Sequence, residues 1–464
     1  MSTRASLCFL GAAGTVTGSK HWLRTERHQI LLDCGLFQGL KALRLRNWAD
    51  PAFTASEIDA VVLSHAHIDH SGALPLLVAH GFGGPIYCTP GTADLLSVLL
   101  PDSARLQEED AERANRRGYS KHHPALPLYT ADDAEKALRL IETRTYGETF
   151  AVTPDLSAHL RRAGHILGSA TVEIQGADHS FGKLVFSGDL GRSDRPILHD
   201  PEPVPHADVL LIEATYGDRT HVGDPSAELA RIVNESADRR GVLVIPAFAV
   251  GRTQDLLWTL RSLEDEGRIP KLPVFLDSPM AIDVTRMYRR HSEDHDLEMA
   301  RLVDDGRSPL SPHRYRITRT KEESQALNQL VGPLILISAS GMATGGRILH
   351  HLKARLPDSR TTVLLPGYQA AGTRGRALQD GAQYLRIHGA DISVKARVEC
   401  LDGFSAHADR NELLAWVASF DEPPRRVYVV HGEPPAAEAF ALAIQERWPS
   451  TAVEVARDGD EIAL

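Results

Sequence analysis

The sequence is organised around Val61-Val62-Leu63-Ser64-His65-Ala66-His67-Ile68-Asp69-His70. Residues 59–63 are apolar and rich in valine, which predicts a short buried strand, and residues 73–79 are typical of a helix. The histidines are therefore expected on a loop between strand and helix. His65 and His67 are two residues apart, so they point the same way in an extended backbone and suit one metal ion. Asp69 and His70 turn to a second side and suit a second ion.

Imidazole and carboxylate groups are typical ligands of zinc or a similar borderline ion, with positions left open for water. The alternative is a polar, histidine-rich surface loop, or a set of buried histidines satisfied by hydrogen bonds. Four potential ligands within six residues, directly after a buried strand, favour the metal site.

Composition restricts the class of protein. The chain has 464 residues, of which 42% are hydrophobic and 24% charged, which indicates a globular protein of two or three domains. No run of 18 apolar residues occurs, so no membrane span is expected. A net charge of -10 argues against binding nucleic acid by bulk electrostatics, but it allows a local basic groove or a metal-centred site. The scattered cysteines predict reduced thiols and a cytoplasmic protein.

Further candidate residues lie where predicted strands end. Asp33 ends an apolar strand, His165 lies between glycines after a strand, Asp189 lies in a glycine-rich turn, and Glu213 ends the strand 209–213. Taken singly, a strand-end acid is usually a turn former.

The middle of the chain, residues 218–394, alternates strands with helices. This alternation predicts a parallel sheet covered on both faces. The predicted strands are 241–245, 272–276, 332–337 and 362–365. Gly251, Arg252, Ser340 and Gly341 lie in loops that follow two of them, where ligands and phosphates bind in such sheets. The alternative is that these glycines only serve tight turns.

Together these motifs identify a resemblance. Residues 65–70 resemble the HxHxDH signature of the metallo-β-lactamase superfamily, and Asp33, His165 and Asp189 match further motifs of that superfamily in the same order. Three later stretches resemble motifs A, B and C of the β-CASP nucleases: 213–217, 401–409 and 427–433. The resemblance spans essentially the whole chain.

The resemblance implies an α/β fold, a metallo-β-lactamase αββα sandwich with an inserted β-CASP domain whose parallel sheet is flanked by helices. The first part of the sandwich is expected at 1–217, the β-CASP domain at 218–394 and the second part of the sandwich at 395–464.

It also implies roles for the candidate residues. Two Zn²⁺ ions per chain would be bound, with Asp189 as the bridging ligand. His65, His67 and His165 would hold the first ion, and Asp69, His70 and His431 the second. Asp33 would orient a metal-binding histidine. The catalytic residues would be Asp69, Asp189, Glu213 and His407. His407, hydrogen-bonded to Glu213, would protonate the leaving ribose oxygen after attack by metal-activated water.

The histidine at position 431 resembles the RNA-cleaving branch of the family. The chain is therefore expected to be a zinc-dependent ribonuclease that hydrolyses phosphodiester bonds of single-stranded RNA in RNA processing or decay. Gly251, Arg252, Ser340, Gly341 and Ser405 are the expected substrate-binding residues. The expected partner is single-stranded RNA and not a membrane, and a homodimer is left open.

Two other classes of function are considered. A hydrolase of a small ester or thioester could use the same metal site, but the β-CASP insert and the pair of His407 and Glu213 argue against it. A non-catalytic RNA-binding subunit is the second alternative. Degenerate relatives of that kind lose metal ligands, and none is lost here.

Overall fold

A computed structural model describes residues 5–118, 120–176, 181–221, 223–370 and 372–464. The chain forms two compact units. The first comprises Met1–Asp194, Asp200–Thr220 and His407–Leu464, and the second comprises Arg195–His199 and His221–Ala406. Each unit is described by itself.

The first unit contains two seven-stranded sheets. The order in the first sheet is β22 (Glu461–Ala463), β1 (Ala5–Phe9), β2 (His21–Thr25), β3 (Gln29–Leu32), β4 (Ala60–Val62), β5 (Ile86–Cys88) and β6 (Ile141–Thr143). Strands β22 to β3 pair antiparallel, and β3 to β6 pair parallel. The N-terminal hairpin and the C-terminal strand therefore share one sheet although they lie at opposite ends of the sequence.

The second sheet of this unit also joins distant segments. Its order is β21 (Ala452–Val455), β20 (Arg426–Val430), β11 (Val209–Glu213), β10 (Leu184–Phe186), β9 (Ala170–Gly176), β8 (Leu156–Arg162) and β7 (Thr149–Thr153). Strand β11 pairs parallel with β20. The chain thus returns to this sheet after completing the second unit.

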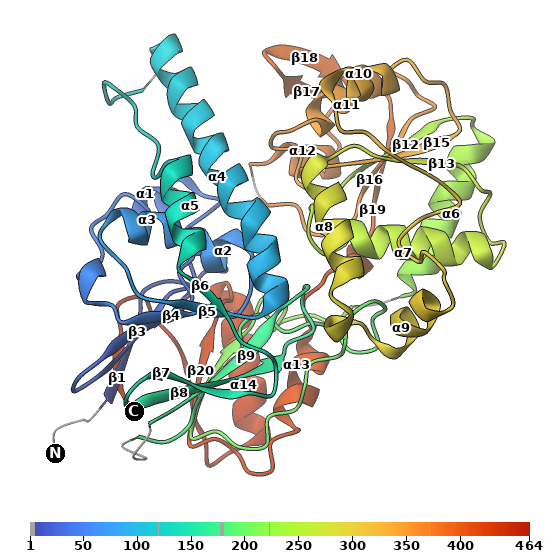
Figure 1. The fold of residues 1–464 in the computed structure, drawn as a ribbon. Coiled ribbons are helices and arrows are strands. Elements are labelled where there is room, and N and C mark those ends of the chain that lie inside the picture. Colours follow the sequence, from blue (N-terminus) through green and yellow to red (C-terminus); the bar gives the residue numbers. More distant parts are fainter. Residues whose placement is uncertain (1–4, 119, 177–180, 222, 371) are drawn as a thin grey trace. The chain divides into compact units, whose positions relative to one another are not determined.

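Helices cover the outer faces of the two sheets (Figure 1). The first sheet carries α1 (Lys41–Arg46), α2 (Ile68–Ser71), α3 (Leu74–Ala79), α4 (Pro90–Arg117) and α5 (Ala131–Arg139), and the second carries α13 (Arg410–Val417) and α14 (Pro434–Arg447). Buried side chains such as Phe9, Leu23, Val172 and Phe186 pack between the sheets. This arrangement confirms the predicted αββα sandwich.

The second unit is built on one six-stranded sheet. Its order is β14 (Arg314–Ile317), β13 (Pro273–Leu276), β15 (Leu334–Ser338), β12 (Val242–Pro246), β16 (Thr362–Leu365) and β19 (Arg397–Cys400). Every pair in it is parallel, as the sequence predicted. The loops that follow β12, β15 and β16 therefore lie at one edge of the sheet.

Helices lie on both faces of this sheet, and each face has its own apolar core. One face packs against α6 (Pro225–Asp238), α7 (Arg252–Asp265) and α8 (Pro279–Arg290). The other packs against α10 (Lys321–Leu327), α11 (Ile348–Arg355), α12 (Arg374–Gln379) and the hairpin of β17 (Tyr384–Ile387) and β18 (Ala390–Ser393). The unit also contains α9 (Leu297–Asp304). No helix in the described ranges is long and apolar enough to cross a membrane.

Candidate metal centre

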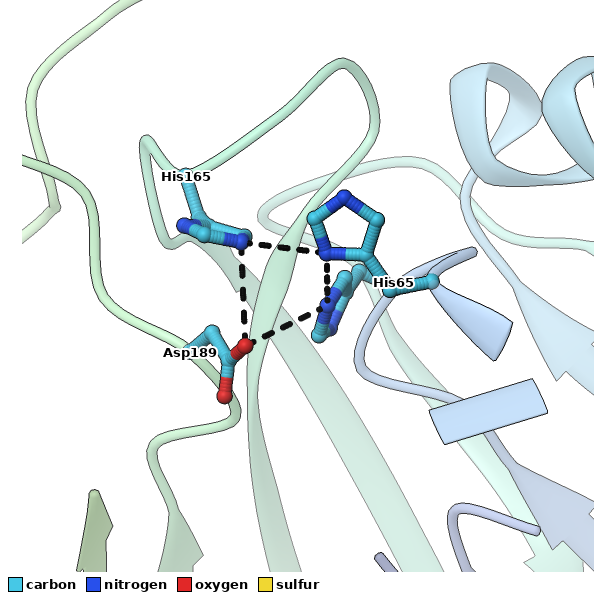
Figure 2. A group of neighbouring side chains, drawn as sticks. His65, His165 and Asp189 are labelled. Carbon is cyan, nitrogen blue, oxygen red and sulfur yellow. Dashed lines mark hydrogen bonds and ion pairs between the residues drawn. The ribbon is translucent and has the colours of Figure 1, made fainter. Parts of the chain in front are cut away.

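Four side chains of the first unit converge on one point. His65 and His67 follow β4, His165 lies between β8 and β9, and Asp189 follows β10. Nδ1 of His67 lies 3.1 Å from Nε2 of His65 and 3.2 Å from Nε2 of His165. Oδ2 of Asp189 lies 3.5 Å from Nε2 of His65 and 3.6 Å from Nε2 of His165. Figure 2 shows His65, His165 and Asp189 pointing toward one another.

This spacing fits a tetrahedral ion. Zinc–nitrogen bonds of about 2.0–2.1 Å place neighbouring ligand atoms of a tetrahedron about 3.3–3.4 Å apart, and the four observed distances run from 3.1 to 3.6 Å. Burial, helped by neighbouring imidazoles, lowers the pKa of His65 and of His165 well below the usual value, and burial lowers the pKa of His67 to about 4. All three rings are therefore neutral and offer a lone pair, as a metal requires.

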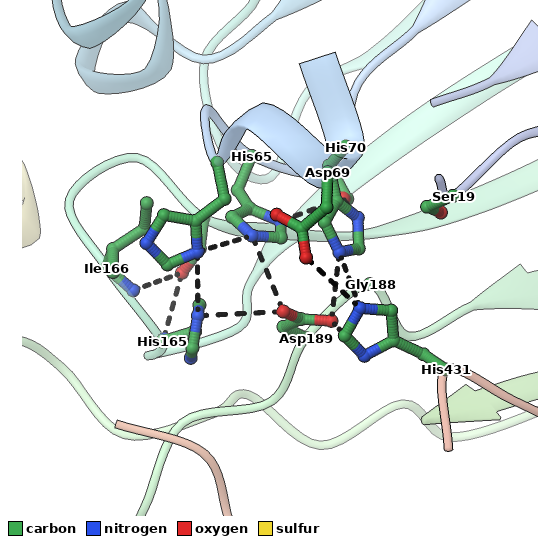
Figure 3. A network of polar contacts seen from close by, with 12 residues as sticks. Ser19, His65, Asp69, His70, His165, Ile166, Gly188, Asp189 and His431 are labelled. Carbon is green, nitrogen blue, oxygen red and sulfur yellow. Dashed lines mark hydrogen bonds and ion pairs between the residues drawn. The ribbon is translucent and has the colours of Figure 1, made fainter. Parts of the chain in front are cut away.

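A second cluster lies on the other side of Asp189 (Figure 3). Nε2 of His70 lies 3.1 Å from Nε2 of His431, which lies 3.6 Å from Oδ2 of Asp69. Oδ1 of Asp189 lies 3.3 Å from Nε2 of His70, and it accepts no hydrogen bond within the described part of the chain. Asp189 thus offers one oxygen to each cluster. Two adjacent ion sites joined by a carboxylate are a known arrangement for hydrolysing phosphate esters.

The sequence placed the second pair of ligands on a loop, but the structure corrects this detail. Asp69 and His70 lie in the short helix α2, and His67 precedes its first residue. The helical turn brings Nε2 of His70 to Nε2 of His431, although the His70 ring still packs against the ring of His65.

Asp33 contacts the side of the His70 ring that faces away from His431. Its Oδ2 lies 2.6 Å from Nδ1 of His70, so that nitrogen donates to the carboxylate and Nε2 is turned toward His431 and Asp189. Oδ2 also accepts hydrogen bonds from the hydroxyls of Ser19 and Ser64, and Oδ1 accepts one from the Ser64 amide. The contact is the one expected of a residue that orients a metal-binding histidine. The two serines had no assigned role in the sequence.

His431 is held by a residue that sequence reasoning also missed. The Thr215 hydroxyl lies 3.0 Å from Nδ1 of His431 and 3.2 Å from its carbonyl oxygen. The His431 amide donates to Ala12 O, and the residue has a positive φ of 46°. Thr215 lies two residues after Glu213 in motif A, and that position was the only signal for it.

His407 and Glu213 lie beside the first cluster. Nδ1 of His407 lies 3.3 Å from Oε1 of Glu213 and 3.9 Å from Oδ2 of Asp189. Burial opposes protonation of His407, but Glu213, Asp189 and Asp69 outweigh it and raise its pKa to about 9. The two Glu213 oxygens accept hydrogen bonds from the amides of Leu190 and Thr215. The geometry therefore suits a proton donor at His407 rather than a third ion.

The expected substrate-binding residues all belong to the second unit. Arg252 begins α7 after Gly251, and a Cβ built on Gly367 would lie 2.3 Å from its Nη1. The Gln369 amide donates to the carbonyls of Gly341 and Gly367, which ties together the loops after β15 and β16. Ser340 also lies in the loop after β15. Ser405 is buried elsewhere in the unit. None of the five is part of the two clusters, and their role in binding substrate stays a prediction.

Three family models match the chain. They are a beta-lactamase superfamily domain at residues 28–244, a Beta-Casp domain at 253–378, and a Zn-dependent metallo-hydrolase RNA specificity domain at 391–453. The zinc dependence in the third description agrees with the donor atoms of the two clusters.

Individual relatives match over most of their length. Ribonuclease TTHA0252 of Thermus thermophilus is 38% identical over 91% of this chain and 92% of its own. Transcription termination factor FttA of Methanosarcina mazei is 31% identical over 94% of this chain and 68% of its own. A crystal structure of a protein of unknown function from Enterococcus faecalis shares the fold, with a TM-score of 0.55, 14% identity and 99% and 100% of the two chains covered.

Proposed function

Because the chain belongs to the β-CASP family of metallo-β-lactamase-fold hydrolases, we propose that it is a zinc-dependent ribonuclease. It hydrolyses phosphodiester bonds of single-stranded RNA in RNA processing or decay. The observation that carries this proposal is the pair of buried clusters that share Asp189, with a protonated His407 beside them. The RNA specificity domain matched at residues 391–453 supports RNA as the substrate.

Seven side chains would hold two zinc ions. His65, His67 and His165 bind the first, Asp69, His70 and His431 bind the second, and Asp189 binds both. When bound, such a pair lowers the pKa of a water molecule and polarises the phosphoryl oxygen. Asp33 and Thr215 keep His70 and His431 turned toward the ions through their Nδ1 atoms.

The remaining catalytic residues handle protons. Burial raises the pKa of Asp69, but His431 and His70 outweigh burial and lower it, so this carboxylate is ionised and can accept a hydrogen bond from the attacking water. His407 delivers a proton to the leaving ribose oxygen, and Glu213 keeps its imidazole charged and oriented. Loss of such a donor costs about 10²-fold or more in rate.

The test uses one RNA sequence labelled in turn at each end, the same sequence as DNA, and a p-nitrophenyl ester. Zinc-loaded protein is expected to cleave the RNA fastest, and a chelator should abolish cleavage. The pattern of products also separates internal from terminal cleavage. His65→Ala should be inactive, whereas His206→Ala, an exposed histidine of the same unit, should keep full activity. Ester hydrolysis without RNA cleavage would instead identify a small-molecule hydrolase.

The proposal includes a cytoplasmic location, which the free cysteines of the described chain support. A homodimer is the assembly to be tested, by light scattering of the zinc-loaded protein at several concentrations.

A further inference from the structure

The second unit contains a buried carboxylate with charged and hydroxyl partners. Asp277 follows β13, and none of its surface is exposed. Its Oδ1 accepts hydrogen bonds from the Thr318 hydroxyl and, at 2.7 Å, from Nη1 of Arg347. Its Oδ2 accepts from the Ser324 hydroxyl and from Nε2 of His351, each at 2.6 Å. One carboxylate thus joins the ends of β13 and β14 to α10 and α11.

The charge of Asp277 is held in place by these donors. Burial alone would keep the carboxyl neutral, but the bonds from His351, Ser324, Thr318 and Arg347 outweigh it and lower its pKa to about 2. Buried ion pairs add little net stability compared with apolar packing of the same volume, because both charges lose their hydration. The cluster is therefore better explained by the geometry that it imposes than by the stability that it adds.

That geometry concerns the loop of residues 339–347, which we call the Ser340 loop. Arg347 ends it, and besides Asp277 this guanidinium donates to the carbonyls of Thr318 and Arg319. At its start, the Ser338 hydroxyl donates to the Asp277 carbonyl. Both ends of the Ser340 loop are consequently fixed to Asp277.

Inside the loop, the side chain and carbonyl of Ser340 hold the turn. The Thr344 amide donates to the Ser340 hydroxyl at 3.1 Å, and the Ala343 amide donates to the Ser340 carbonyl. By contrast, the amides of Gly341, Met342, Gly345 and Gly346 donate to no group in the described ranges.

The loop is open beside Gly345. A Cβ built on Gly345 would meet no atom within 4 Å. Successive unpaired N–H groups in a tight loop form a concave site for phosphate oxygens.

From this arrangement we infer that Asp277 is a positioning residue for RNA binding: through Arg347 it keeps the Ser340 loop in the shape whose main-chain N–H groups bind a backbone phosphate. The inference rests on the proposed ribonuclease function. Contacts to phosphate are independent of base sequence. A strand held by the second unit reaches the metal centre at a raised effective concentration, because both units belong to one chain.

The test compares two substrates of the zinc-loaded protein. Asp277→Asn should raise KM for single-stranded RNA by about tenfold or more, since it removes charge-assisted hydrogen bonds from Arg347 and His351. The rise should be equal for RNAs of different sequence. Hydrolysis of bis(p-nitrophenyl) phosphate should be unchanged, because this small diester has no strand for the loop to bind. In hydrogen exchange, the amides of Ala343 and Thr344 should lose protection.

Asp380→Asn is the matched control. Asp380 is an exposed carboxylate that pairs with Arg376 in the same unit, so the variant removes the same charge without removing a hydrogen bond to Arg347. Its KM for RNA should equal that of the unmodified protein. Where Asp277→Asn fails to fold, Arg347→Gln replaces it, because Asp277 then keeps its other three donors. Arg347→Lys should restore part of the RNA affinity.

Three outcomes would overturn the inference. One is a folded Asp277→Asn or Arg347→Gln protein with unchanged KM for RNA. Another is a parallel loss of activity on RNA and on the small diester, which would indicate general damage to the protein. The third is an unmodified protein that hydrolyses the small diester but no RNA. Only this third result would remove the proposed function as well.

Discussion

Asp189 is the residue on which both proposed ion sites depend. It is buried, and each of its oxygens faces a different cluster of histidines. Burial disfavours its charge, but His431 and His70 outweigh burial and hold its pKa well below the usual value. An ionised carboxylate at this position would be able to bind two cations at once.

His407 and His431 lie close together but should respond differently to substitution. His407→Ala is expected to keep both metal ions and lose RNA cleavage by about 10²-fold or more, because it removes a proton donor. His431→Ala should weaken binding of the second ion, because it removes a ligand. Metal analysis and single-turnover cleavage of both purified variants would check this.

If His407→Ala lost an ion while His431→Ala kept both, the roles assigned to the two histidines would be interchanged. His206→Ala serves as the control for loss of an imidazole from the same unit.

Asp277 makes stability depend on pH. Its pKa is lowered from 3.8 to about 2 in the folded state. The resulting stabilisation, about 2 kcal/mol, is complete above the unfolded pKa and is lost as pH falls from about 4 toward 2. Asp277→Asn should therefore lose less stability than the unmodified protein over this interval. Urea titrations at pH 5, 4 and 3 would measure the free energy of unfolding of both proteins. The same loss of stability between pH 5 and pH 3 in both would contradict the prediction.

At the scale of elements, the site is built where strands end. His65 follows β4, Asp189 follows β10, Glu213 ends β11 and His431 follows β20. Gly188, between β10 and Asp189, has a positive φ of 57°, and a Cβ there would lie 2.6 Å from Cβ of Ser64. The turn that presents Asp189 therefore requires glycine for its conformation and for its contact with the Ser64 segment.

Gly188→Ala is expected to destabilise the protein and reduce its zinc content. The matched control is Gly267→Ala, which also has a positive φ, of 70°, but meets no atom within 4 Å. Gly267→Ala should cost about 1–2 kcal/mol from backbone strain alone. Gly188→Ala should cost more, because Ser64 and Asp189 must also move. Denaturant unfolding and metal analysis would separate the two effects, and equal costs would argue against the contact.

At the scale of the whole molecule, the clusters join segments that are remote in sequence. His70 and His431 are separated by 361 positions, yet their Nε2 atoms lie 3.1 Å apart. Both sheets of the first unit contribute, through β4, β10, β11 and β20. Bound ions would therefore link the two layers of the sandwich.

Removal of the metal ions should accordingly lower the stability of the first unit and leave that of the second unchanged. Free zinc at about 100 times its dissociation constant stabilises the folded state by about 2.7 kcal/mol per site. Chelation should lower the melting temperature. Hydrogen exchange should rise at residues 64–70, 187–191 and 430–433, with the amides of α7 as the internal control. Increased exchange in α7 alone would show that the ions bind elsewhere.

The sequence alone was enough to predict the kind of elements and the order of the chemical groups along them. Apolar runs predicted β4, β11 and four parallel strands of the second unit, β12, β13, β15 and β16, but not β14 or β19 of the same sheet. The residues after predicted strands included His65, His165, Asp189 and His431. Asp33 could be connected with a metal-binding histidine because the aspartate of the matching family motif has that role. These signals are local, since each depends on a few neighbouring residues.

Only the tertiary structure decided which of these groups meet and what supports them. Ser19 and Ser64 have no sequence signal beyond that of ordinary loop residues, and Thr215 has only its place in motif A. The two serines nevertheless donate to Asp33, which contacts His70, and Thr215 contacts His431 directly. Asp277 looks like a turn former until Arg347 and His351 surround it, 70 and 74 positions later. The packing of strands and helices from distant segments determines which of these residues come into contact. A pattern of adjacent residues does not indicate that packing.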